Sequence, residues 1–122
     1  MSYNTKEIWI PCDTVENELP DDDESDEEAI ECGGSDIERG LLYGVHGILE
    51  STGGTVVVRV FNNDEKHREL YKTTLDYSGG VTQVSDVGLS IPMFETPYYT
   101  LESDATSGEK DFEVTFYVKA LA

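Results

Sequence analysis

The sequence predicts an all-β protein, an antiparallel β-sandwich or jelly-roll-like barrel of about seven strands. Three observations predict it: short segments alternate apolar and polar residues with a period of two, turn residues separate them, and no segment shows a convincing helical period. The turns contain residues that tolerate positive φ. These turn sequences are Gly33-Gly34, Gly53-Gly54, Asn62-Asn63-Asp64, Gly79-Gly80 and Ser107-Gly108.

Two strands are the clearest. Thr55–Phe61 places three valines on one face and Arg59 on the other. Asp111–Ala120 alternates more strictly, with Asp111, Glu113, Thr115, Tyr117 and Lys119 on one face. The opposite face carries Phe112, Val114, Phe116, Val118 and Ala120. Each pattern is typical of a strand that buries one face of a sheet.

Five further segments are rich in β-branched or aromatic residues and are expected to be strands. They are Lys6–Pro11, Leu41–Glu50, Leu70–Tyr77, Val87–Ile91 and Pro97–Ser103. Two glycines, Gly44 and Gly47, interrupt the second of them. Such glycines mark a bulge or a close backbone approach, so this strand is expected at a sheet edge or a barrel corner.

Acidic residues are concentrated between the first strand and the rest of the chain. In residues 13–38, 13 of 26 residues are Asp or Glu and none is Lys or Arg. A segment of this charge density buries too little apolar surface to offset the ordering of its backbone. We therefore expect an N-terminal arm or first strand (1–12), an acidic flexible segment (13–38) and a β-sandwich body (39–122).

The net charge of −18 limits the possible partners. DNA, RNA and anionic membranes are bound through Lys and Arg, so neither nucleic acid nor a membrane is expected as a partner. A basic protein surface or metal cations are the electrostatic alternatives. For the acidic segment three readings stay open: a solvated loop, a loose calcium-binding polyanion, and a tether to a basic partner. No signal peptide or membrane span is recognised, so synthesis in a cytoplasm is expected.

Catalytic and metal-binding motifs are not found. The histidines, His46 and His67, have no nucleophile at a recognisable spacing, and no phosphate-binding or dinucleotide-binding loop occurs. The expectation is a protein that is not an enzyme, with no catalytic residue, metal site or cofactor. Cys12 and Cys32 flank much of the acidic segment and are a candidate disulfide; two free thiols are the alternative, favoured by the missing secretory signal.

Two segments are candidates for contact with a partner. The arm contains Ile8, Trp9 and Ile10, and an arm strand can pair with a neighbouring sheet edge. The second segment has two prolines, which favour an edge or loop, and aromatic residues that are frequent at interfaces. Its candidates are Met93, Phe94, Tyr98 and Tyr99.

The C-terminal third carries a resemblance. The stretches Val-Gly-Leu-Ser-Ile-Pro-Met-Phe (87–94), Tyr-Thr-Leu-Glu-Ser-Asp (99–104) and Phe-Glu-Val-Thr-Phe-Tyr-Val-Lys (112–119) resemble the ends of small structural proteins of tailed bacteriophages. The resemblance implies a virion component, a capsid cement or decoration protein that binds the major capsid protein and its own copies, as a homo-trimer. It also implies a place on the outer capsid surface.

Two other functions compete with this one. An acidic inhibitor that mimics DNA would need carboxylates spaced like phosphates along a rigid surface, whereas the acids here are crowded into one segment. A carbohydrate-binding or host-adhesion module would present an aromatic platform, for which Trp9, Tyr98 and Tyr99 are few.

Overall fold

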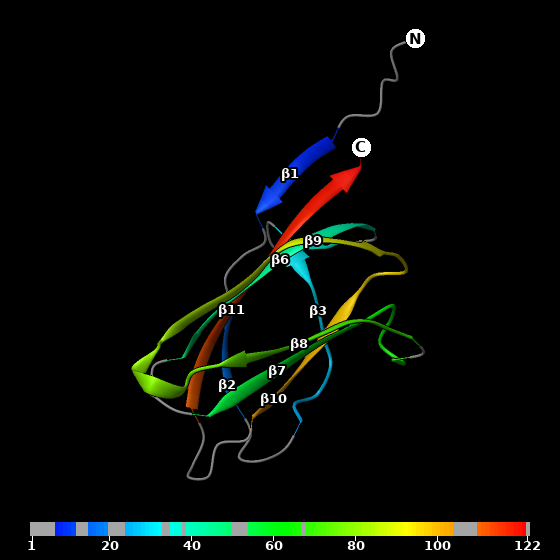
Figure 1. Cartoon of the computed structure of the whole chain (residues 1–122). Coiled ribbons are helices and arrows are strands. Elements are labelled where there is room, and N and C mark those ends of the chain that lie inside the picture. The colour runs from blue at the N-terminus through cyan, green and yellow to red at the C-terminus, as the bar shows by residue number, and fades with distance from the viewer. Residues whose placement is uncertain are drawn as a thin grey trace.

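The computed structural model describes residues 7–11, 15–19, 24–32, 35–37, 39–49, 54–66, 68–103 and 110–121. Two antiparallel sheets pack face to face as a sandwich (Figure 1). The strands of the first sheet are β1 (Glu7–Pro11), β2 (Val15–Leu19), β6 (Gly40–Leu49), β9 (Gln83–Met93) and β11 (Lys110–Leu121). Those of the second are β3 (Glu28–Ala29), β7 (Thr55–Phe61), β8 (Glu69–Asp76) and β10 (Tyr98–Ser103). The strands β4 (Glu31–Cys32) and β5 (Ser35–Asp36) pair with each other, and a 3₁₀ turn, η1 (Ser78–Gly80), follows β8.

The strand order is that of a jelly roll. The first sheet runs β1-β11-β6-β9, with β2 also paired to β11, and the second runs β3-β10-β7-β8. The antiparallel pairs are therefore nested along the chain: β1 and β2 with β11, β3 with β10, β6 with β9, and β7 with β8. Nested pairs divided between two sheets are the jelly-roll arrangement, so the expected fold class is confirmed.

All seven expected strands are present as β1, β6, β7, β8, β9, β10 and β11. The expectation of a flexible acidic segment is corrected for those of its residues that the structure describes. The segment supplies β2 to one sheet and β3 to the other, together with the β4–β5 pair, instead of standing apart as a flexible loop. Its few apolar residues are the reason, because Ile30 and Ile37 are both buried in the core. Charged neighbours are tolerated because a strand can bury one face while the other meets water.

The core lies between the two sheets and follows the alternation read from the sequence. From β7 come Val56, Val58 and Val60, all at most 1% exposed. From β11 come four further core residues: Phe112, Val114, Phe116 and Val118. Full burial of one such side chain stabilises the fold by about 1.5–3 kcal/mol, so this two-sided layer is the main stabilising feature.

The strand that contains Gly44 and Gly47, β6, occupies a different place in the sheet from the one expected. The strand lies in the middle of its sheet, between β11 and β9, and not at an edge or corner. The expected bulge is present, since the pairing register shifts between Leu42 and Gly44. The expected close approach is present too. A Cβ at Gly47 would lie 2.4 Å from the Tyr77 hydroxyl and 2.5 Å from Cζ of Phe112, so only glycine fits beneath these two rings.

The Tyr77 ring is fully buried against Phe112, edge to face, with the ring centroids 6.1 Å apart. Its hydroxyl is buried and has no hydrogen-bond partner among the described residues. Burial raises the pKa of the Tyr77 phenol above its ordinary value of 10.0, because the charged phenolate is poorly solvated there. The side chain is thus held by packing and not by a polar contact.

Replacing Gly47 with alanine should destabilise the protein by about 2–3 kcal/mol, because the added methyl group overpacks the core. Urea unfolding measures this loss. Gly44→Ala is the matched control in the same strand, where the nearest neighbour of the new Cβ is a Tyr117 ring atom at 3.3 Å. Equal losses for the two variants would contradict the close approach at Gly47.

Tyr77→Phe removes the unpaired buried hydroxyl and should raise stability at pH 7 by about 1 kcal/mol. The tyrosine's raised pKa predicts a second effect. A phenol that binds its proton more tightly in the folded state contributes stability that is complete below about pH 10 and is lost as pH rises further. Thermal unfolding at pH 7 and pH 11 should therefore show a smaller alkaline loss for the variant. A less stable variant at pH 7 would show that the hydroxyl has a partner.

Candidate functional site

The second candidate segment is divided by the fold between core and surface. Phe94 is 56% exposed and Tyr98 is half-buried, so both remain candidates. Met93 and Tyr99, in contrast, are buried, and their assignment to a partner surface is corrected. Tyr99 packs on Phe116 with ring centroids 4.9 Å apart, because successive residues of β10 point to opposite faces.

The arm candidates lie in β1, which pairs with the last residues of β11. The two strands form a ribbon that extends beyond the rest of the sandwich (Figure 1). On its other side β1 has no partner strand in the described part of the chain. The side chains of Ile8, Trp9 and Ile10 lie outside the described atoms, so only the backbone position of these candidates is known.

The remaining residues named from the sequence are dispersed. Cys12 and His67 lie outside the described residues, and of Cys32 only the backbone, in β4, is described. The candidate disulfide is therefore not tested. His46 lies on β6, where its Nδ1 atom makes a hydrogen bond with the Ser85 hydroxyl on β9. The described residues contain no group of three or more His, Cys, Asp or Glu side chains placed to hold a metal ion.

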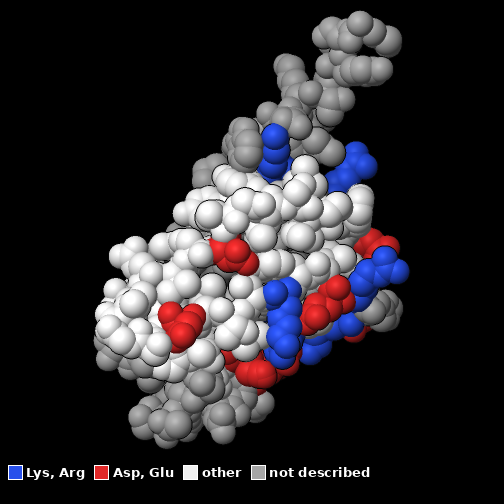
Figure 2. Space-filling model, in the orientation of Figure 1, with Lys and Arg blue, Asp and Glu red and all other residues white. Residues whose placement is uncertain are grey.

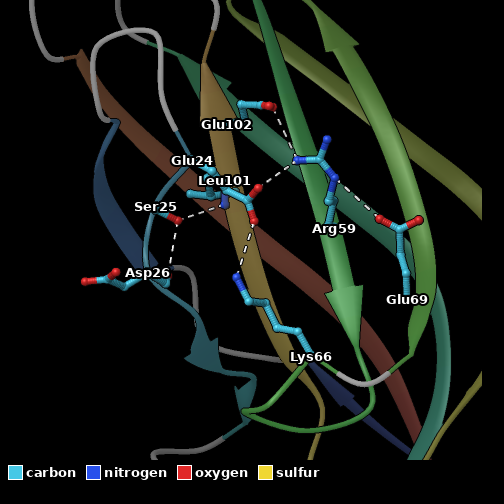
Figure 3. Close-up of polar contacts among 8 residues, drawn as sticks. All are labelled: Glu24, Ser25, Asp26, Arg59, Lys66, Glu69, Leu101 and Glu102. Carbon is cyan, nitrogen blue, oxygen red and sulfur yellow. Dashed lines mark hydrogen bonds and ion pairs between the residues drawn. The ribbon is translucent and has the colours of Figure 1, made fainter.

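A cluster around Arg59 was not recognised in the sequence. The guanidinium of Arg59 on β7 contacts three carboxylates, those of Glu24, Glu69 and Glu102, each at 3.4 Å (Figure 3). Lys66 lies 3.8 Å from the other oxygen of Glu24. The Arg59 side chain is only 19% exposed, so water screens these contacts less than those of a surface ion pair. The only signal in the sequence was a single arginine among the apolar residues of positions 56–61.

Hydrogen bonds to the backbone of Pro97 and Leu101 hold the same stretch of the acidic segment against β10. The Ser25 amide donates to the Leu101 carbonyl at 2.7 Å, and the Leu101 amide donates to the Ser25 hydroxyl at 2.9 Å. Further along, the Ile30 amide donates to the Pro97 carbonyl at 3.0 Å. Residues 24–30, which we call the acidic latch, thus lie along β10 and form the edge of the second sheet. Arg59 stabilises this contact within the chain, because it pairs with Glu24 of the latch and with Glu102 of β10.

A neutral surface lies on the opposite edge of the sandwich. Residues 77–94, which we call the neutral edge, comprise η1, β9 and Phe94. At the chain's average of 28% charged residues such a stretch would carry about five charges, yet it carries one, Asp86. In Figure 2 the charged side chains gather toward the turn between β7 and β8, and the surface on the side of η1 is mostly uncharged.

A pocket of about 430 Å³ lies at the end of the neutral edge. Its lining residues are Asn62, Arg68, Leu70, Phe94 and Glu95. Its amide and carboxylate groups already bond to one another, since Asn62 Nδ2 donates to Glu95 at 3.3 Å and Asn62 Oδ1 accepts from the Arg68 amide at 3.0 Å. The pocket therefore offers a partner mainly the Phe94 ring and the Arg68 guanidinium.

No protein-family model matches this chain, and no curated protein matches it in sequence. No helix in the described part of the chain is long and apolar enough to span a bilayer.

Replacing Arg59 with alanine should loosen the acidic latch while leaving the core intact. Hydrogen exchange of the Ser25 amide measures this, and we expect it to become about 5- to 10-fold faster, equivalent to roughly 1 kcal/mol. Arg68→Ala is the control, since its side chain has no ion pair among the described residues and the backbone bond to Asn62 is retained. Unchanged Ser25 exchange in the Arg59 variant would show that the backbone contacts alone hold the latch.

Proposed function

We propose that this chain is a non-enzymatic structural protein of a phage particle, a cement or decoration protein that binds the major capsid protein on the outer capsid surface. The proposal starts from the resemblance of the C-terminal third. The observation that carries it is the β1–β11 ribbon, a strand pair that extends from the jelly-roll sandwich and has an unpaired edge among the described strands.

The ribbon is suited to reach a neighbouring protein. The outer edge of β1 presents backbone N–H and C=O groups to which a strand of another protein can add. Its sequence, Glu-Ile-Trp-Ile-Pro, combines a tryptophan with two isoleucines, and buried tryptophans contribute strongly to many interfaces. In this proposal Ile8, Trp9 and Ile10 contact the capsid protein, and Phe94 and Tyr98 remain secondary candidates.

The charge of the chain supports the outer surface over the lumen. Packaged DNA would repel a protein of net charge −18, whereas basic patches on a capsid shell would attract it. Attraction of this kind raises the association rate and weakens as salt screens it. Capsid binding should therefore decrease with ionic strength. The proposed location is the virion, after synthesis in the host cytoplasm.

Mass spectrometry of purified particles tests the proposal directly. We expect the chain in amounts comparable to those of the major capsid protein, and electron microscopy of labelled particles should place it on the outside. For particles stripped of the protein, Trp9→Ser should require a concentration at least tenfold higher than wild type to rebind, because it removes a large apolar contact. Trp9→Phe, which keeps an aromatic ring, is the matched control.

Absence of the chain from purified particles would rule out the cement role. Equal rebinding by wild type and Trp9→Ser would leave a virion role but remove the ribbon as its contact surface.

A further inference from the structure

We propose that the neutral edge binds a second copy of this chain, with β9 of one molecule against β9 of the other in an antiparallel, two-fold contact. The resemblance implies a homo-trimer, whereas a two-fold contact gives a dimer, so this inference departs from that expectation. What is new is the contact surface, the neutral edge, and the two-fold symmetry that follows from pairing β9 with β9. The contact is a property of the isolated chain, so it stands apart from the proposed virion role.

The first argument is that β9 is a long sheet edge without a partner. It ends the order β1-β11-β6-β9, and no described strand pairs with its outer side. Its first half is regular, since Gln83–Val87 pairs residue by residue with β6. The second half is irregular: Gly88 has φ of +78°, and Pro92 lacks an N–H. An added strand would therefore pair with Gln83–Val87.

The second argument is the exposed apolar surface. In the described part of the chain three large hydrophobic side chains are exposed, and all three belong to the neutral edge. Val87 is 66% exposed on β9, Val81 is 43% exposed before the strand, and Phe94 is 56% exposed after it. The three side chains are spread along the length of one edge, at both ends and in the middle of β9, so a partner that lies along the whole strand would cover all of them.

The third argument is a comparison with the other free edge on the same side of the sandwich. The strand β8 ends the second sheet, and it carries Glu69, Lys72 and Asp76. Charges of this kind prevent association between sheet edges. On β9 the single acid, Asp86, is engaged within the molecule by the hydroxyl of Tyr71. The edge of β8 is therefore protected against pairing in a way that the edge of β9 is not.

The fourth argument selects a second copy as the occupant. A two-fold contact uses the same surface on both molecules, so any charge on that surface is brought close to its own copy. For a chain of net charge −18 this repulsion disfavours a two-fold contact through an acidic surface, and it is weak at the neutral edge, which carries one charged residue. A basic partner would gain more from the acidic surfaces of this chain than from its neutral one.

Analytical ultracentrifugation of the full chain tests the contact. At high protein concentration the wild type should approach twice the 13.6 kDa mass of one chain, and Val87→Glu should remain at 13.6 kDa. Thr74→Glu is the matched control, because it adds the same charge at an exposed position of β8 and should still dimerise. Val87→Lys should also be monomeric even though it makes the chain less negative, at −17 instead of −18. Circular dichroism spectra that match the wild type would show that each variant is folded.

Salt distinguishes this contact from capsid binding. Dimerisation through a neutral surface should strengthen as salt screens the repulsion between two acidic molecules, whereas capsid binding should weaken. A wild-type monomer at all concentrations, a mass of three chains, or dimerisation of Val87→Glu equal to wild type would each overturn the inference. Val87→Glu should still rebind stripped particles, so failure of one proposal does not imply failure of the other.

Discussion

The rest of the structure depends on the burial of one face of β11. This strand pairs with β6 on one side and with both N-terminal strands, β1 and β2, on the other. Its four apolar side chains fill the space between the sheets, and Phe112 reaches over Gly47 of β6. Because a strand points alternate residues to opposite faces, burying this row also fixes which residues of β6, β1 and β2 face outward. The position of the β1–β11 ribbon depends directly on this strand, and the position of the neutral edge depends on it through β6.

Charge is distributed over this framework in an ordered way. The acidic latch covers the edge of the second sheet and is neutralised in part by Arg59 and Lys66. The opposite side combines a protected edge, β8, with the edge of β9, whose single charged residue is Asp86. A chain with a large negative charge thus retains one surface where a like-charged molecule can approach without strong repulsion. The two proposals use different surfaces for this reason, with the ribbon assigned to a capsid partner and the neutral edge to a second copy.

The sites were less predictable than the strands. Phe94 was recognised as a surface candidate from its sequence context, but Met93 and Tyr99 beside it are buried, since a residue's face depends on the pairing register. Arg59 was assigned to the outer face of its strand, yet its three carboxylate partners come from positions 24, 69 and 102. Only the folded chain brings these positions together. The neutral edge was missed for a related reason, because a neutral stretch becomes a surface only when its strand ends a sheet.

The amino-acid sequence by itself determined the all-β class, the seven main strands and the buried faces of β7 and β11, because period-two alternation and turn glycines are local signals. It also determined the net charge and hence the kinds of partner that are favoured. The tertiary structure alone decided that β6 is central and that the acidic segment contributes strands to both sheets. Those outcomes depend on pairings between residues far apart in the chain, where a few apolar side chains such as Ile30 and Ile37 outweigh the charge around them.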